Sequence, residues 1–208
     1  QGQGIYLKNE FSMYFPTSES FRPYQIITHF FMHADLFHIL FNMVGLVVFG
    51  SHLERTWGKK RFFTYYLVTA LGAMVLHTGV EAYEIYSHTG VWFPTVDGLN
   101  EMYHASEITL YDGQFAVSTI EIPTLGASGA VYGLLMAFAL LFPNTQFQLL
   151  FPPIPIKAKW LALILGGIAV YNGFMQSGGG VAHFAHLGGM LFGFIMIKVW
   201  QRNKNTFY

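Results

Sequence analysis

The stretch of sequence that decides the fold is LFHILFNMVGLVVFGSHL, residues 36–53, which contains no Asp, Glu, Lys or Arg. An α-helix rises about 1.5 Å per residue, so this stretch would be roughly 27 Å long, close to the thickness of the hydrocarbon core of a bilayer. An uncharged run of this length is typical of a transmembrane helix. We therefore predict that it spans a membrane.

Uncharged runs of similar length follow this first stretch, and the sequence QSGGG at 176–180 divides the last of them in two. The predicted spans after the first are residues 62–80, 122–142, 160–176 and 181–200. With residues 36–53 they make five, which predicts an all-α polytopic membrane protein.

The composition of the whole chain agrees with this class. Of its 208 residues 53% are apolar and only 11% are charged, against about 25% charged in an ordinary soluble domain. Eleven Lys and Arg balance eleven Asp and Glu, so there is no basic field to hold nucleic acid. The chain has no cysteine, which excludes a disulfide scaffold, a thiolate metal site and a cysteine nucleophile.

The charged residues are divided between the two sides of the predicted membrane. Nine of the eleven cations fall in the loop 54–61, the loop 143–159 or the C-terminal part after residue 197, whereas ten of the eleven acids fall on the opposite side. Lys and Arg accumulate on the cytoplasmic side of membrane proteins. We therefore predict a membrane domain over 36–200, with residues 1–35 and a polar insertion at 81–121 outside and a cytoplasmic tail at 201–208.

Polar side chains also occur within the predicted spans, where they cost free energy unless they are paired. His38 and Asn42 are four residues apart and so share one helix face, and His33 lies just before that helix. Such a pair could join two helices by hydrogen bonds or could belong to a functional site. The remaining histidines outside the last span, at 29, 52, 77, 88 and 104, are interpreted as interfacial or loop residues.

A second polar group lies at the outer start of the third predicted span, in the sequence Gly126-Ala127-Ser128-Gly129. The glycines allow close backbone approach and leave N–H groups exposed, so Ser128 could be a nucleophile. The nucleophile elbow of soluble hydrolases does not fit, because it needs glycine where Ala130 stands. Alternatively, Ser128 is only a small residue beside a packing stripe that consists of Gly129, Gly133 and Ala137.

The last span carries a second stripe of small residues, which consists of Ala185, Gly189 and Gly193. If the two stripes pack together, His186 comes within hydrogen-bond reach of Ser128, and Tyr132, one turn after Ser128, lies under the imidazole. Ser128, His186 and the spans around them include no carboxylate, so a dyad rather than a Ser–His–Asp triad is predicted. No His-Glu-x-x-His motif occurs, which disfavours a metal site.

Taken in order, the chain carries His-x4-His-x3-Asn at 33–42, Gly-x-Ser-Gly at 126–129 and His-x2-Gly-x3-Gly at 186–193. Together these motifs resemble those of the rhomboid intramembrane serine proteases. The resemblance implies a rhomboid-like helical bundle in which Ser128 is the nucleophile, His186 the base, and His38 and Asn42 the oxyanion donors. It also implies a supporting set, which consists of His33, Gly126, Gly129, Tyr132, Gly189 and Gly193.

The same resemblance implies what the protein does: it would cut transmembrane segments of single-span membrane proteins within the lipid bilayer, without a cofactor. We expect a bacterial cytoplasmic membrane, with the site open to the outer face. The alternative is an inactive rhomboid-like protein that binds membrane clients. The chain departs from the family's pattern in two ways. The family's first helix has no counterpart here, so we expect a truncated chain. The insertion at 81–121 is also longer than the family's usual loop.

Overall fold

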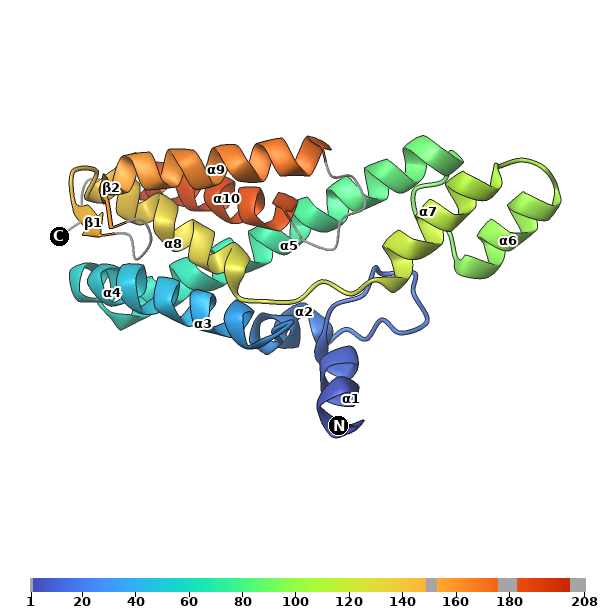
Figure 1. Cartoon of the computed structure of the whole chain (residues 1–208), viewed down its shortest axis with the longest axis horizontal. Coiled ribbons are helices and arrows are strands. Elements are labelled where there is room, and N and C mark those ends of the chain that lie inside the picture. Colours follow the sequence, from blue (N-terminus) through green and yellow to red (C-terminus); the bar gives the residue numbers. More distant parts are fainter. Residues whose placement is uncertain (1, 149–152, 176–182, 203–208) are drawn as a thin grey trace.

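The computed structural model describes residues 2–148, 153–175 and 183–202, and side chains from residue 7 onward. Within them the chain is a bundle of helices lying side by side, with a smaller group of helices at one end (Figure 1). Four helices are long and apolar enough to cross a membrane, and a fifth is apolar but shorter. The predicted class of a polytopic helical membrane protein is therefore confirmed.

The first span is one continuous helix, Leu36–Trp57, built from α3 (Leu36–Gly45), a π-helical segment and α4 (Ser51–Trp57). It begins where predicted because the Asp35 side chain caps it, accepting a hydrogen bond of 2.8 Å from the His38 N–H. It ends one turn later than predicted, at Gly58, whose φ of +78° a residue with a side chain rarely adopts.

The second span, α5, runs from Lys59 to Thr89 and is 31 residues long. The predicted span ended at residue 80, so the first nine residues of the predicted polar insertion are in fact a continuation of this helix. At about 1.5 Å per residue it is roughly 46 Å long, which is longer than a bilayer core is thick. α5 ends at Gly90, which has a left-handed φ of +72°.

The rest of the insertion folds into two short helices, α6 (Val96–His104) and α7 (Leu110–Glu121), each capped by a threonine side chain. They lie beside the outer end of α5, beyond the main bundle (Figure 1). They share a small apolar core with α5 and the N-terminal segment, made of Phe15, Ala82, Ile85, Leu99, Ala116 and Ile120. This core holds the insertion as a folded unit rather than an open loop.

The third predicted span is shorter than expected: α8 is Ser128–Leu141, 14 residues. The prediction began it at residue 122, but Pro123 and the positive φ of Gly126 (+118°) are incompatible with a helix there. Thr124 instead pairs with Met13 in an isolated antiparallel bridge, with N–H to carbonyl distances of 2.8 and 2.9 Å. Residues 122–125 thus lie outside any helix beside this bridge, and Gly126 and Ala127 lead from them to Ser128.

A small antiparallel hairpin, β1 (Gln146–Gln148) with β2 (Pro155–Lys157), precedes the fourth span. That span is α9, Ala158–Met175, and the fifth is α10, His183–Arg202. Both agree closely with the predicted spans, although the start of the last prediction, at 181, and most of the predicted tail lie outside the described residues.

The core of the bundle forms where α10 packs against α5 and α8, with glycines at the closest points. A Cβ at Gly189 would collide with the carbonyl oxygen of Gly129, and one at Gly193 would lie 3.2 Å from the carbonyl oxygen of Gly133. The two small-residue stripes therefore do face each other, as predicted. Tyr65 of α5 adds a hydrogen bond of 2.8 Å to the Gly133 carbonyl.

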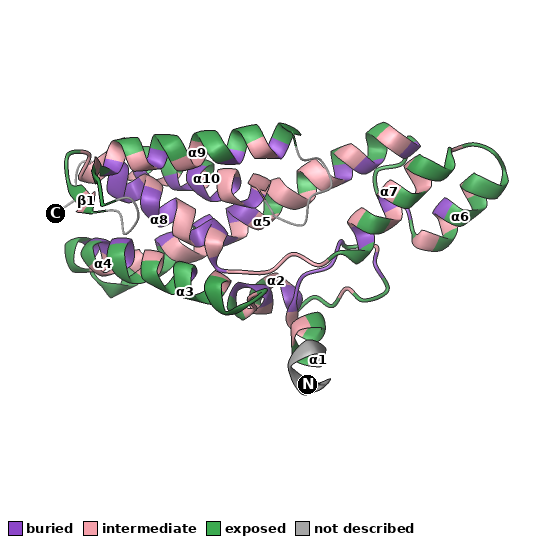
Figure 2. Ribbon diagram, viewed as in Figure 1, coloured by how far each residue is buried: buried purple, intermediate pink, exposed green. Residues whose placement is uncertain are grey.

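Burial follows this arrangement. Buried residues concentrate along α8 and the inner sides of α5 and α10, whereas α3 and α9 are mostly exposed (Figure 2). The exposed side chains on those two helices are largely apolar, for example Phe37 at 69% and Leu163 at 63% exposed. A surface of this kind is suited to contact with lipid rather than water.

Candidate active site

Ser128 is the first residue of α8. The first N–H groups of a helix have no partner within it and carry the positive end of the helix dipole. The backbone N–H at Ser128 is therefore available next to its own hydroxyl, at a position that favours negative charge. The non-helical segment 122–127 ends here, so the geometry of that segment determines where the serine side chain lies.

His186, in the first turn of α10, reaches Ser128 across the α8–α10 contact. Its Nε2 atom lies 2.9 Å from Ser128 Oγ, a hydrogen-bond distance. The contact depends on the close approach of the two helices at Gly129 and Gly189, where any side chain would separate them. The two residues are 58 positions apart in sequence, and the two glycine stripes bring them together.

Tyr132 packs flat against the imidazole of His186. The two ring centroids are 4.2 Å apart and the ring planes are only 2° from parallel. The stack leaves the His186 ring little freedom to turn away from Ser128. Among the described residues no carboxylate forms an ion pair with His186, so the orientation that an aspartate would supply in a triad must come from this packing.

His38 lies on α3 with its two ring nitrogens in different roles. The Ala34 N–H donates a hydrogen bond of 3.1 Å to His38 Nδ1. Because Nδ1 accepts, a neutral His38 carries its proton on Nε2. That nitrogen faces the segment before the nucleophile, since a Cβ built at Gly126 would lie 2.9 Å from it. The N–H donor of His38 thus lies beside Gly126, which stands two residues before Ser128 in the sequence.

Asn42 is 4% exposed and lies one turn further along α3. Its Nδ2 donates a hydrogen bond of 2.8 Å to the backbone carbonyl of His38, within the same helix. One of the two amide hydrogens is used in this bond and the other remains to be donated. The described contacts therefore link Asn42 to its own helix rather than to a neighbour.

His33 stands beside His38, with ring centroids 5.2 Å apart in an edge-to-face arrangement. Neither of its buried ring nitrogens has a hydrogen-bond partner among the described residues. Burial first, and the neighbouring His38 ring second, lower the pKa of His33. The lowered pKa favours the neutral form of the ring that packs against His38.

A single cavity of about 950 Å³ contains these groups. Ser128, His186, His38 and Asn42 all line it, and so does Tyr132. Such a volume lies within the usual range of about 300–1,000 Å³ for ligand-binding pockets. In the described part of the chain no group of three or more His, Asp, Glu or Cys side chains could hold a metal ion.

The whole arrangement can be compared with known proteins. A family model described as the rhomboid domain matches residues 20–203, most of the chain. The chain belongs to the rhomboid family. The resemblance read from the three motifs is therefore confirmed at the level of the family.

Named relatives agree with this membership. The chain is 28% identical to RHOMBOID-like protein 12, mitochondrial, of Arabidopsis thaliana over 88% of its own length and 48% of that protein. It is 28% identical to Rhomboid protein 1, mitochondrial, of Saccharomyces cerevisiae over 86% of this chain and 42% of that protein. It is also 28% identical to Rhomboid protease AarA of Providencia stuartii, over 78% of this chain and 50% of that protein. It thus spans about half the length of these rhomboid relatives.

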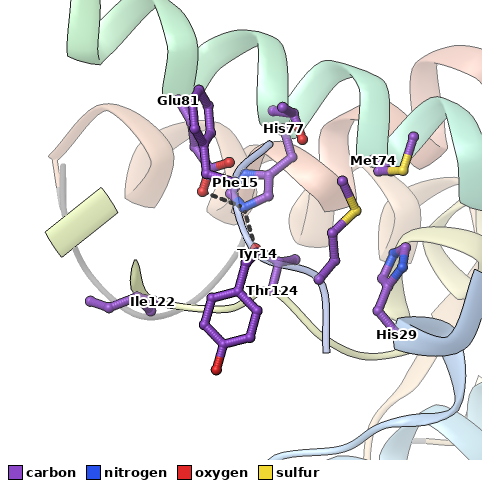
Figure 3. Close-up of a pocket in the computed structure, with 10 residues that line it drawn as sticks. Tyr14, Phe15, His29, Met74, His77, Glu81, Ile122 and Thr124 are labelled. Carbon is purple, nitrogen blue, oxygen red and sulfur yellow. Dashed lines mark hydrogen bonds and ion pairs between the residues drawn. The ribbon is translucent and has the colours of Figure 1, made fainter. Parts of the chain in front are cut away.

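One pair of residues at this rhomboid site was missed by the sequence analysis. His77 and Glu81, on α5, also line the cavity. Figure 3 shows them in a small neighbouring pocket, where His77 Nε2 lies 2.8 Å from Thr124 Oγ1 and 3.2 Å from Glu81 Oε1. Both partners meet the same nitrogen, so this group is not a catalytic triad, in which the carboxylate and hydroxyl use opposite nitrogens.

The interpretation of His77 as an interfacial or loop residue was therefore too simple. The available signal was the spacing, because an acid four residues after a histidine shares its helix face. Glu81 lies just beyond residue 80, the end of the predicted span. His29, placed in the same class, is buried at 4% exposure, and its Nδ1 lies 2.6 Å from the Gln25 carbonyl.

Proposed function

We propose that this rhomboid-family chain is an intramembrane serine endopeptidase that cleaves single-span membrane proteins through Ser128 and His186. The observation that carries the proposal is the 2.9 Å contact between His186 Nε2 and Ser128 Oγ inside a cavity of about 950 Å³. A serine becomes a nucleophile when a base is within hydrogen-bond reach and is itself oriented. The stacked ring of Tyr132 meets the second condition.

The reaction follows from these positions. As Ser128 Oγ attacks the scissile carbonyl carbon, His186 Nε2 takes the hydroxyl proton and the carbonyl oxygen gains the negative charge. The Ser128 N–H, His38 Nε2–H and the remaining Asn42 amide hydrogen are the donors proposed for that oxygen. When the C–N bond breaks, the leaving amine takes the proton from His186, and an acyl-enzyme remains.

The second half repeats these roles with water. His186 takes a proton from a water molecule as its oxygen attacks the acyl carbon, and the proton returns to Ser128 Oγ when the ester bond breaks. The polar groups that line the cavity support this step, because polar groups at membrane depth are tolerated where they line a space that water can enter. No step requires a cofactor.

The site is proposed to open on the side away from the cation-rich loops. Ser128, at the start of α8, lies at the end of the bundle that carries the acid-rich insertion (Figure 1). The expected bacterial cytoplasmic membrane stays a prediction, since the relatives include proteins named for mitochondria as well as one from a bacterium.

The experiment is proteolysis of defined substrates. We would incubate the purified chain in liposomes with a panel of single-span membrane proteins and map the products by mass spectrometry. We expect at least one substrate to be cut in or near its transmembrane segment, and no product with Ser128→Ala. Substrates that co-purify with the folded protein and stay intact would favour the inactive client-binding alternative instead.

A further inference from the structure

The active-site cavity extends well beyond the dyad. One of its walls is a single face of α7, in the insertion between the second and third spans. The residues of this wall recur every three or four positions and are Tyr111, Gln114, Phe115, Ser118 and Thr119. The opposite side of α7 is fixed in the small core of the insertion by Ala116 and Ile120, which are fully buried. The wall is therefore held in place by folded structure.

The α7 wall has the character of a peptide-binding surface. Gln114 and Ser118 are exposed to the cavity, and within the described residues their side chains make no hydrogen bond, so an amide and a hydroxyl are available to a ligand. Tyr111 and Phe115 on the same face offer aromatic area. Rigid aromatic side chains beside adaptable polar ones are typical of surfaces that bind protein segments.

Two carboxylates on α5, Glu81 and Glu84, line the same cavity. Glu81 is engaged with His77, whereas no hydrogen bond or ion pair reaches the Glu84 carboxylate from the residues that the structure describes. Asp35 also lines the cavity but caps α3. The lining residues thus include three carboxyl groups, whereas Lys8 is the one Lys or Arg among them.

We infer that the insertion is a substrate-recognition element, in which the α7 wall and Glu84 bind the extramembrane segment just outside the scissile bond and favour a Lys or Arg there. This inference rests on the proposed function. The occupant is a peptide rather than a lipid because the wall is continuous with the cavity around Ser128. A chain held at Ser128, at the outer end of α8, must leave past residues 122–125, which line the same path.

The first test uses three matched single-span substrates that differ at one position outside the cleavage site, with Lys, Gln or Glu. Because exchanging Lys for Glu replaces attraction by repulsion, we expect kcat/KM to be about three- to tenfold higher for the Lys substrate. Glu84→Gln should bring the ratio of kcat/KM for the Lys and Glu substrates closer to one. Glu101→Gln, an exposed acid of α6 that does not line the cavity, is the matched control and should keep it.

Glu84→Lys separates a specific effect from misfolding, because a misfolded protein would lose activity with every substrate rather than prefer a different one. Glu84→Lys should reverse the preference, so that the Glu substrate becomes the better one. Equal kcat/KM for the three substrates with the unsubstituted protein, or an unchanged preference in Glu84→Lys, would overturn the inference while leaving the proteolytic function intact.

Binding separates the inference from the proposed function. Ser128→Ala protein in liposomes should retain more of the Lys substrate than of the Glu substrate in a pull-down. If nothing is cleaved by the unsubstituted protein but this difference in binding is observed, the proteolytic function fails and the recognition element stands. If the bound amounts are equal, the recognition element is contradicted whatever the cleavage assay gives.

Discussion

At the residue scale, few groups orient the proposed nucleophile and base. Ser128 is positioned by the backbone of a non-helical segment, and His186 by a ring stack and by two glycines that let the helices meet. Gly126 adds a third constraint, because it combines a φ of +118° with contact to the His38 ring. Changes at Gly126 should therefore affect turnover more than folding.

The first prediction concerns Gly126→Ala. The new Cβ would lie 2.8 Å from His38 Cε1 and would force an unfavourable φ, so it should displace both the His38 donor and the approach to Ser128. We expect kcat to fall by about 10²-fold, the cost of one lost oxyanion donor. Gly79→Ala, in a part of α5 with nothing within 4 Å of the added Cβ, is the control and should keep full activity.

The second prediction concerns the stack on His186. Tyr132→Phe keeps the ring and should retain most of the activity, whereas Tyr132→Ala removes the ring and should lower kcat severalfold or more. The melting temperature of both variants should be measured with kcat/KM. Equal losses in the two variants would contradict the role of the ring face.

The third prediction separates two roles for His38 and Asn42. If they are oxyanion donors, His38→Ala and Asn42→Ala should each lower kcat by about 10²-fold with little change in melting temperature. If they only stabilise the bundle, Asn42→Ala should instead cost about 0.5–2 kcal/mol of stability. A large loss of melting temperature with near-normal turnover of the folded fraction would reject the oxyanion role.

At the element scale, the contact of α8 with α10 is the one that assembles the site. The Cβ of a larger residue at Gly189 would overlap the Gly129 carbonyl oxygen, and that carbonyl belongs to a helix that also touches Ala73 of α5. Neither helix can move away without disturbing a third. The same contact that stabilises the bundle therefore also sets the distance between Ser128 and His186.

The fourth prediction follows from this packing. Gly189→Val should destabilise the bundle by about 1–3 kcal/mol or more, because overpacking forces the helices apart, and it should also abolish turnover. Gly167→Ala on α9, where nothing lies within 4 Å of the added Cβ, is the control. Thermal unfolding in detergent measures both, and an unchanged melting temperature for Gly189→Val would refute the packing.

At the scale of the whole molecule, much of the architecture could be predicted from the sequence. Long uncharged runs identify α3 with α4, α5, α9 and α10, because burying a charge in lipid is costly whatever the surroundings. The start of α8 could not be read in this way, since residues 122–127 are as free of charge as a helix would be. Thr124 in this segment instead pairs with Met13, a partner far away in sequence.

The candidate site, like the fold, could be predicted from the sequence only in part. Local motifs and helix periodicity brought Ser128 and His186 to one place, because both stand beside stripes of small residues that can meet. The α7 wall and the His77–Glu81 pair were not foreseen, since their place in the cavity depends on how the insertion folds back beside α5. Such tertiary placement leaves no periodic signal in the sequence.

The most direct test of the central claim, that His186 activates Ser128, is covalent labelling by a fluorophosphonate, located by mass spectrometry. The account predicts that the unsubstituted protein is labelled on Ser128, that His186→Ala slows this labelling by orders of magnitude, and that Ser128→Ala abolishes it. Absence of label on the folded, unsubstituted protein, or labelling of His186→Ala at the unsubstituted rate, would contradict it.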